Sequence, residues 1–505
     1  MSTRRLFNNS LFSIISKVTN ALIQLVCLPV LLQVFGKGDY GLIVLAMSLN
    51  TFITIIQLGL PTGLPKFVAE WLAEGKHKQL HSAIKTVMSF YLIIAVVNFL
   101  LLLVISFYGT ELFKVNIGQI STLQTLLTIT AITSLLSIPA TVLDQLLTGA
   151  QELGFLSSLE MIRNVFFAGL VVFVYTHPSS ISISGFYALQ CVLMFVMIPA
   201  KLWRWLRYGS ITVFVPGWYF KNILPLLKYC LSLMAFSIFI AIADKLNPVI
   251  LGIRIPSNAG TALTDYQIIN YIRTFLLMIS SSFMVALIPH ISGASAGGNQ
   301  IIYSKTIEQG TKYIWAVGAL LGFGLIMMSK EVLSIYVGPE NISLKIWLMI
   351  MIGTSLYNLY STPIASVILS SGKLVPMLFA TASGCLVSTI LCWFLTPRYG
   401  VGAVVLSMAG YNIINLLVTH FWYLPRYFSV KPIHQIVHVM LPPALAGVIM
   451  CLMGRFIISK LAYTNDYINV AIGAISGTIV YTSIIMMIYI RPREACELYL
   501  RIKKR

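Results

Sequence analysis

Charged residues are scarce in this sequence. Only 10% of its 505 residues are Asp, Glu, Lys or Arg, whereas 58% are hydrophobic. A soluble globule of this length needs much more polar surface than these residues can provide. The shortage excludes a soluble protein and indicates a chain whose hydrophobic surface is covered by a lipid bilayer.

Acidic residues are scarcer than basic ones. The chain has 15 Asp and Glu against 34 Lys and Arg, which gives a formal net charge of +19. With the N-terminus placed in the cytoplasm, 24 of the 34 basic residues fall on the cytoplasmic side and nine on the opposite side, and Arg273 alone lies well inside a span. This asymmetry is the positive-inside bias of membrane proteins. It predicts that both termini are cytoplasmic, and it argues against a nucleic-acid partner.

Motifs for disulfides, metals and cofactors are also lacking. Six of the seven cysteines fall in hydrophobic runs, so the sequence indicates no disulfide framework. The segment Gly36–Gly41 (GKGDYG) contains G-x-G-x-x-G, but it joins two hydrophobic runs and is therefore predicted to be a tight turn. His434 and His438 have the spacing of a zinc helix, but Gln435 follows the first and no third ligand is apparent. We predict no catalytic residues, no cofactor and no bound metal.

Long hydrophobic runs dominate what the sequence does contain. Fourteen of them are long enough to cross a bilayer, which takes roughly 20 residues. We expect spans at residues 10–34, 41–64, 84–108, 123–148, 158–176, 184–206, 228–253, 265–291, 310–328, 343–370, 374–396, 400–424, 435–458 and 468–490. The predicted fold is all-α and polytopic, with about fourteen transmembrane helices.

Two segments of the chain echo each other. Pro29 to Leu32 end one expected span and Asp39–Tyr40 begin the next, and the same order recurs at Pro248 to Leu251 and Asp265–Tyr266. A weaker echo around Gly149 and Gly372 has a similar separation of a little over two hundred residues. Repeated lobes of this kind are typical of transporters, and a duplication kept for packing alone is the alternative.

The repeat predicts a division of the chain into lobes and connecting segments. We expect six-helix lobes at residues 1–206 and 228–424, joined by a basic cytoplasmic linker at residues 207–227. An extra helix pair at residues 435–490 and a basic cytoplasmic tail at residues 491–505 follow.

Polar side chains inside the first two spans form stripes. Lys17, Asn20 and Gln24 share one helix face, and Asn50, Thr54 and Gln57 share a face of the next helix. Polar groups are costly in a membrane, so each stripe is expected to face water or another polar stripe. For the amides, a binding site and interhelical hydrogen bonds are equally good interpretations.

The second lobe begins with further polar residues. Asp244 and Lys245 lie in the seventh span, and Asn270 and Arg273 lie in the eighth. Arg273 would cost about 3 kcal/mol if it faced lipid, so we expect it to pair with Asp244 or to bind an anionic ligand such as a phosphate. The predicted substrate cavity comprises Arg273, Lys17, Lys245, Asn20, Gln24, Asn50, Gln57, Asp244 and Asn270.

These segments carry a resemblance to a known family. The run FGKGDYGLIVLAMSLNTFITIIQLGLPTGLPKFVAEW resembles the polysaccharide flippase branch of the multidrug/oligosaccharidyl-lipid/polysaccharide (MOP) exporter superfamily. The resemblance rests on the turn, on the glycine-tyrosine-glycine helix start and on the Leu-Gly-Leu sequence before the first cytoplasmic loop. Asp244 and Arg273 extend it to the seventh and eighth spans.

The resemblance implies a fold like that of the MOP and MATE transporters, and a function. A flippase of this kind moves an oligosaccharide on undecaprenyl diphosphate, such as an O-antigen repeat unit of lipopolysaccharide, to the periplasmic leaflet of the bacterial inner membrane. A multidrug or cation exporter of the same superfamily is the alternative, and a glycan polymerase is a third. The implied partners are the lipid-linked oligosaccharide, membrane lipids, a polysaccharide polymerase and a chain-length regulator, with H⁺ or Na⁺ as candidate coupling ions.

Overall fold

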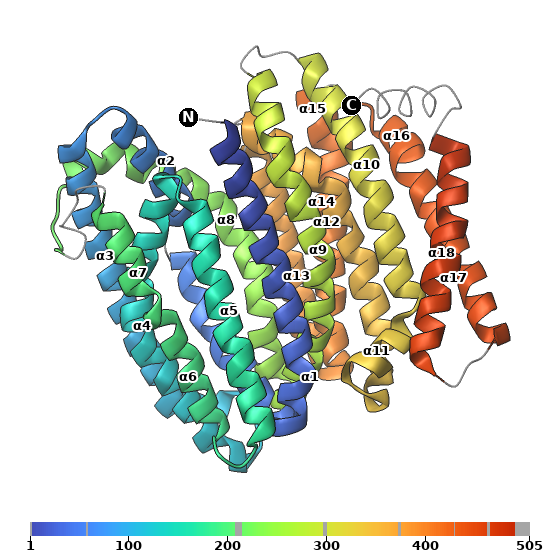
Figure 1. The fold of residues 1–505 in the computed structure, drawn as a ribbon, viewed down its shortest axis with the longest axis horizontal. Helices are drawn as coiled ribbons and strands as arrows, with labels where there is room; N and C mark the ends of the chain where they lie inside the picture. The colour runs from blue at the N-terminus through green and yellow to red at the C-terminus, as the bar shows by residue number, and fades with distance from the viewer. Residues whose placement is uncertain are drawn as a thin grey trace. The chain divides into compact units, whose positions relative to one another are not determined.

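The computed structural model describes residues 3–56, 59–207, 215–295, 300–371, 375–428, 430–461 and 465–489. All regular secondary structure within these ranges is helical, which confirms the predicted all-α fold (Figure 1). The principal helices are α1 (Thr3–Ile56), α2 (Leu60–Ala73), α3 (His77–Val104), α4 (Ile120–Gly149), α5 (Leu153–Thr176), α6 (Ile183–Val196), α7 (Ile198–Leu206), α8 (Phe220–Arg254), α9 (Ala259–Ser295), α10 (Gln300–Met327), α11 (Ser329–Val337), α12 (Lys345–Ser371), α13 (Val375–Tyr399), α14 (Val401–Leu417), α15 (Leu424–Phe428), α16 (Pro432–Gln435), α17 (Leu441–Leu461) and α18 (Asp466–Tyr489).

The number of spans agrees with the sequence. Among the described residues, eleven helical stretches are long and apolar enough to cross a membrane. One of them, Ile15–Asn50, lies within α1, and Gly36 breaks that helix into two legs with a positive φ of 76°. α8 with 35 residues and α9 with 37 also have spanning length. Ten of the eleven stretches lie outside α1. Together with the two legs of α1, α8 and α9, they make up the fourteen spans that the sequence predicts.

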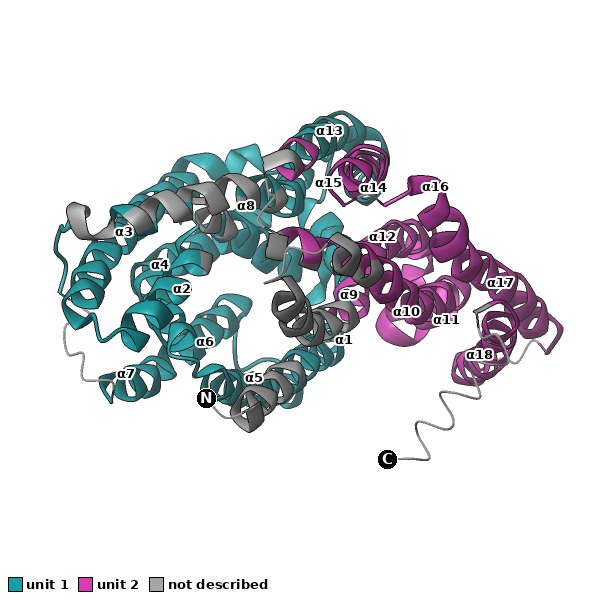
Figure 2. Ribbon diagram, turned by 90° about the horizontal axis from the view of Figure 1, so that it is seen from above, with its two compact units in different colours: residues 1–271, 381–407 teal, residues 272–380, 408–505 magenta. Residues whose placement is uncertain are grey.

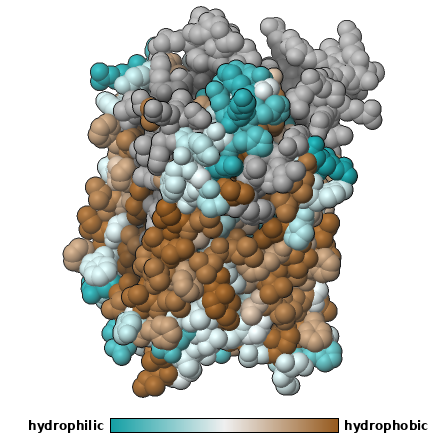
Figure 3. Space-filling view, turned by 90° about the vertical axis from the view of Figure 1, so that its left-hand side faces the viewer, coloured by the Kyte–Doolittle hydropathy of each residue, from teal (hydrophilic) through white to brown (hydrophobic). Residues whose placement is uncertain are grey.

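Large hydrophobic side chains cover the outside of the helices. Phe394, Leu452 and Phe107 are 71%, 68% and 65% exposed. Figure 3 shows a wide hydrophobic band on one face, with hydrophilic residues toward both ends. Such a surface is stable against lipid tails, so the chain is a multi-pass membrane protein.

The helices group into two compact units. Unit 1 comprises Met1–Tyr271 and Thr381–Ser407, and unit 2 comprises Ile272–Ala380 and Met408–Arg505 (Figure 2). The grouping follows packing and not the internal repeat. α8 contains the start of the second predicted lobe, but it packs against α1 and α2 of the first. The lobes at residues 1–206 and 228–424 stay a prediction.

A hydrophobic cluster holds one end of unit 1 together. It joins α2, α3, α4, α7 and α8, and Trp205 of α7 is fully buried in it. Residues 215–219, in the predicted linker, run along α3, where the amide nitrogen of Gly217 donates to Ser89 Oγ at 2.9 Å. α8 begins at Phe220, so part of the predicted linker is helical, and residues 208–214 lie outside the described ranges.

In unit 2, α17 and α18 lie where the extra helix pair was predicted. They pack against each other and against α10 and α11. Arg455 of α17 donates to a carboxylate oxygen of Glu331 in α11 at 2.6 Å, and Glu331 is only 4% exposed. Tyr481 of α18 donates its hydroxyl to the carbonyl of Ala316 at 2.6 Å. Polar contacts therefore fix both helices to the rest of the unit.

Candidate functional site

Unit 1 contains a cavity of about 340 Å³. Its walls come from both legs of α1 and from α5, α6, α8 and the first turns of α9. The polar side chains that line it, tyrosines and Ser48 apart, are Asn20, Gln24, Arg163, Asn164, Gln190, Asp244, Lys245, Gln267 and Asn270. Polar groups gathered at membrane depth mark this cavity as the candidate site.

The break in α1 brings two parts of that helix to the cavity. Gly36 adopts a conformation that side-chain-bearing residues rarely tolerate, so the chain turns there and both legs contribute to the wall. On the first leg, Gln24 Nε2 donates to Asn20 Oδ1 at 3.1 Å. The second leg adds Tyr40 and Ser48. The segment predicted as a tight turn is thus a kink beside the site.

The charged part of the wall lies on α8. Lys245 Nζ is 3.0 Å from an oxygen of Asp244, and both side chains are partly exposed. Pro248 follows one turn later, and proline has no N–H to donate to the carbonyl of Asp244 four residues earlier. The proline therefore interrupts the regular helical hydrogen bonding next to the two charges.

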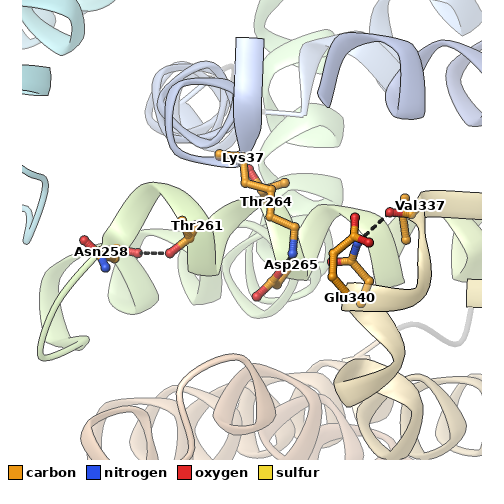
Figure 4. A network of polar contacts seen from close by, with 8 residues as sticks. Lys37, Asn258, Thr261, Thr264, Asp265, Val337 and Glu340 are labelled. Carbon is orange, nitrogen blue, oxygen red and sulfur yellow. Dashed lines mark hydrogen bonds and ion pairs between the residues drawn. The ribbon is translucent and has the colours of Figure 1, made fainter. Parts of the chain in front are cut away.

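The two echoing segments meet beside the cavity. Tyr40 and Tyr271, both in the cavity wall, bring their hydroxyls within 3.4 Å. Next to them, Thr264 Oγ1 donates to the carbonyl of Lys37 at 2.6 Å, and Lys37 Nζ reaches Asp265 at 2.8 Å (Figure 4). The segments that the sequence paired by their similarity are therefore in direct contact.

Glycine allows this contact to be close. A Cβ on Gly41 would lie 1.8 Å from the carbonyl oxygen of Gly260, and one on Gly260 would lie 2.2 Å from the carbonyl oxygen of Gly38. Any larger residue would force the backbones apart.

Five residues of the predicted substrate cavity line the observed one: Asn20, Gln24, Asp244, Lys245 and Asn270. Lys17 is exposed on α1 and is not among the lining residues. Asn50 accepts a hydrogen bond from Asn98 of α3 at 3.2 Å, which matches the interhelical interpretation of its amide. Gln57 lies outside the described residues.

Arg273 belongs to unit 2. Its Nε donates to Ser355 Oγ of α12 at 3.2 Å, and Ser355 Oγ donates to the carbonyl of Met351 at 2.6 Å. The guanidinium is partly buried, as expected for a cation that avoids lipid. Whether it binds a ligand or pairs with Asp244 stays a prediction.

Several lining residues were missed by the sequence analysis. Arg163 and Asn164 fall near the start of the expected span 158–176, where a basic residue is ordinary. α5 begins at Leu153, however, so both lie about three turns inside the helix. Gln190 of α6 and Gln267 of α9 were also missed, although an amide inside a hydrophobic run is the signal that singled out Gln24.

The two histidines with zinc-helix spacing lie elsewhere. His434 stacks on His438 with ring centroids 4.4 Å apart, and its Nε2 is 3.3 Å from Glu308. In the described ranges, no three His, Cys, Asp or Glu side chains form a group that could hold a metal ion.

The charges in the lining suit an anionic ligand. Arg163 and Lys245 are cations and Asp244 is the single acid among the described lining residues, which leaves one positive charge in excess. Amides and tyrosines supply hydrogen bonds around them, and Phe167 and Phe186 supply apolar surface. Such a wall can bind a phosphate together with neutral hydroxyl groups.

Comparisons with known proteins give a family and a fold. The model of a family described as "Polysaccharide biosynthesis protein" matches residues 6–295. No curated protein matches the chain. Among solved structures, the lipid II flippase MurJ in an inward closed conformation is similar with a TM-score of 0.73 and 15% identity, over 95% of this chain and 98% of that chain.

Two transporter structures are also similar. One is an inward-facing multidrug resistance MATE family transporter of the MOP superfamily, with a TM-score of 0.58 and 14% identity over 84% of this chain and 95% of that one. The other is a MOP superfamily transporter from Pyrococcus furiosus, described by the reverse polarity of its binding pocket, with a TM-score of 0.56 and 14% identity over the same shares. Identities this low show a shared fold, which is the MOP fold that the resemblance implied.

Proposed function

Because the chain belongs to the polysaccharide biosynthesis protein family and has the MOP fold, we propose that it is a flippase for a lipid-linked oligosaccharide. Its substrate is an oligosaccharide on undecaprenyl diphosphate, such as an O-antigen repeat unit, which it moves from the cytoplasmic to the periplasmic leaflet by alternating access. The cavity in unit 1 binds the diphosphate and the sugars next to it. Transport leaves the substrate chemically unchanged.

The lining of the cavity is the observation that carries this proposal. A net positive wall favours the diphosphate, and the amides of Asn20, Gln24 and Asn270 offer donors and acceptors for sugar hydroxyls. Family membership points to polysaccharide as the product that this step serves. The similarity to a lipid II flippase is consistent with a lipid-linked substrate.

A multidrug or cation exporter is the second candidate, since MATE transporters share the fold. An organic cation would require an excess of acid in the lining. Here two cations accompany one acid among the described lining residues, so the charge favours an anionic substrate. A glycan polymerase, the third reading of the sequence, has less support because the similar structures are transporters.

Transport by purified protein tests the proposal. Proteoliposomes would contain a fluorescent undecaprenyl diphosphate-linked oligosaccharide, and its exposure in each leaflet would be followed with a membrane-impermeant quencher. We expect movement of this lipid and no movement of a fluorescent organic cation, with chromatography showing an intact oligosaccharide. Transport of the cation alone would establish the exporter, and growth of the glycan would establish a polymerase.

The orientation of the chain in the membrane is part of the proposal. The distribution of Lys and Arg supports cytoplasmic termini in a bacterial inner membrane. Reporter fusions after Arg505 and beside Lys37 provide the test. We expect a cytoplasmic signal from the first and a periplasmic signal from the second, and a reversed pair of signals would overturn this orientation.

The proposal also includes an ion gradient that drives transport and two protein partners. H⁺ or Na⁺ gradients are candidate energy sources, and imposing each gradient separately across the same proteoliposomes would identify the coupling ion by faster movement. A polysaccharide polymerase and a chain-length regulator are the expected partners in the cell.

A further inference from the structure

Two consecutive residues of α5 stand out in the cavity wall. Arg163 and Asn164 lie about three turns inside the helix, and both line the cavity. The rest of the wall carries charge on α8 and amides on α1, so α5 completes the polar lining. In the proposed function Arg163 counts only as one of the two cations of the lining, and Asn164 has no role.

The excess positive charge of the cavity lies at Arg163. The charge of Lys245 is offset by Asp244 at 3.0 Å. Arg163 has instead a neutral neighbour, because its Nη2 donates to Asn164 Oδ1 at 3.5 Å. Across the described part of the chain, no carboxylate lies within ion-pair distance of Arg163, and Glu160, one turn earlier on α5, accepts from Ser16 Oγ at 3.3 Å. An anion in the cavity would therefore be drawn to Arg163.

Asn164 adds a second, independent observation. Its side chain is 5% exposed, and its Nδ2 has no hydrogen-bond partner within the described residues. A buried amide nitrogen without an acceptor is unfavourable, and an acceptor atom on a bound ligand would satisfy it. With Asn164 Oδ1 directed to Arg163, the amide nitrogen is left as the donor for such a ligand.

We propose that Arg163 and Asn164 form the subsite for the junction between the diphosphate and the first sugar of the substrate. Arg163 binds phosphate oxygens with its planar fork, and Asn164 Nδ2 donates to an oxygen of the adjoining sugar. This inference rests on the proposed function and adds the residues that distinguish a glycosylated lipid diphosphate from a bare one.

Binding of short lipid probes to purified protein tests the subsite. The probes are farnesyl diphosphate, farnesyl diphosphate carrying one N-acetylglucosamine, and farnesol as the uncharged control. Wild-type protein is expected to bind the glycosylated diphosphate best, the bare diphosphate less well and farnesol least. Arg163→Gln should weaken binding of both diphosphates about tenfold to a hundredfold and leave farnesol binding unchanged.

The two residues make separable contributions in this experiment. Arg163→Lys keeps the charge without the fork, so it should recover part of the lost affinity. Asn164→Ala should remove the advantage that the sugar gives and leave binding of bare diphosphate within about twofold of wild type. Arg207→Gln is the matched control, because it removes one cation at the exposed end of α7, outside the cavity lining.

The outcomes distinguish the subsite from the proposed function. If Arg163→Gln binds the diphosphates as wild type does while wild-type protein moves the lipid-linked oligosaccharide, the subsite is wrong and the flippase stands. Equal loss of sugar preference in Asn164→Ala and Arg207→Gln would also overturn the subsite. If wild-type protein moves no lipid-linked oligosaccharide, the proposed function itself fails, whatever the probes show.

Discussion

Lys37 Nζ lies 2.8 Å from Asp265 Oδ1, and this ion pair joins the two segments of the chain that echo each other in sequence. The pair belongs to a contact in which the backbones of Gly41 and Gly260 also approach closely. Lys37 begins the second leg of α1, and Asp265 lies in the second turn of α9. Equivalent segments of the repeat therefore pack against each other beside the cavity.

The glycine contact predicts a severe effect of Gly41→Ala. The new Cβ would lie 1.8 Å from the carbonyl oxygen of Gly260, and backbone cannot rotate away as a side chain can. We expect a loss of stability of at least about 1–3 kcal/mol, which is typical of overpacking. Unfolding of purified protein in sodium dodecyl sulfate would measure it.

Gly118→Ala is the control for that experiment. Gly118 lies in the short helical turn before α4, where an added Cβ meets nothing within 4 Å. We expect it to unfold as wild type does. Equal behaviour of Gly41→Ala and Gly118→Ala would contradict the close backbone contact.

The ion pair itself is expected to contribute modestly. The side chains of Lys37 and Asp265 are 30% and 24% exposed, so water screens part of their attraction. A double-mutant cycle with Lys37→Ala and Asp265→Ala should give a coupling of about 0.5–1 kcal/mol in the same unfolding assay. A coupling of zero would contradict this expected contribution of the ion pair.

This part of the fold was predictable from sequence only in outline. The recurrence of proline followed by Asp-Tyr at Asp39–Tyr40 and Asp265–Tyr266 indicated equivalent segments, and hydrophobic runs gave the spans. Sequence similarity says nothing about which surfaces meet, however. The contact of Gly41 with Gly260 depends on how helices pack across more than two hundred residues of chain, which no local pattern encodes.

Asn50 is predicted to stabilise the fold without serving transport. It accepts a hydrogen bond from Asn98, which is 4% exposed, and it does not line the cavity. Asn50→Ala should lower stability by about 0.6 kcal/mol, the usual value of such a bond within a membrane, and leave transport by the folded protein unchanged. Asn20→Ala, in the cavity wall, should instead reduce transport. The interpretation is wrong if Asn50→Ala folds normally and fails to transport.

The ion pair between Arg455 and Glu331 is predicted to hold the C-terminal helix pair in place. Arg455→Ala would leave the carboxylate of Glu331, only 4% exposed, without its partner. We expect a loss of about 1–3 kcal/mol. Glu331→Gln removes the buried charge, so adding Arg455→Ala to it should cost less than Arg455→Ala alone costs in the native background.

Lys460→Ala provides the matched control on α17. Lys460 is exposed, and its Nζ lies 5.8 Å from the ring of Phe456. We expect no measurable change in unfolding for this variant. The same loss in Lys460→Ala and Arg455→Ala would show that any cation on this helix has the effect.

Residues of the candidate site were predictable where the surrounding sequence gave a signal, such as a polar helix face or a charge within an apolar run. Asn20 and Gln24 fell on one helix face, and Asp244 and Lys245 broke an apolar run, so all four were found. Arg163 was missed because the expected span began five residues later than α5 does, which placed a cation near the membrane surface. Lys17 shares a stripe with Asn20, but the cavity does not extend one turn further along α1. Helix periodicity identifies a face, and it does not show where along that face a cavity ends.

Arg273 remains the strongest prediction from the second lobe. Its Nε donates to Ser355 Oγ, a bond that orients the guanidinium without neutralising it. If Arg273 binds the diphosphate, Arg273→Ala should abolish transport, and Arg273→Lys should recover only part of it because a point charge replaces the fork. Ser355→Ala should lower transport less than Arg273→Ala, since it removes only the orienting bond.

The alternative for Arg273 gives a different result in the same assay. If its role is to neutralise Asp244, then Asp244→Ala and Arg273→Ala should each impair transport, and the double variant should restore it, because neither member of that pair is then left without the other. Ligand binding predicts instead that the double variant stays inactive, since the cation that meets the phosphate is still missing. Transport by reconstituted protein, compared at equal amounts of folded protein, separates the two. Full activity in the double variant would assign Arg273 a structural role.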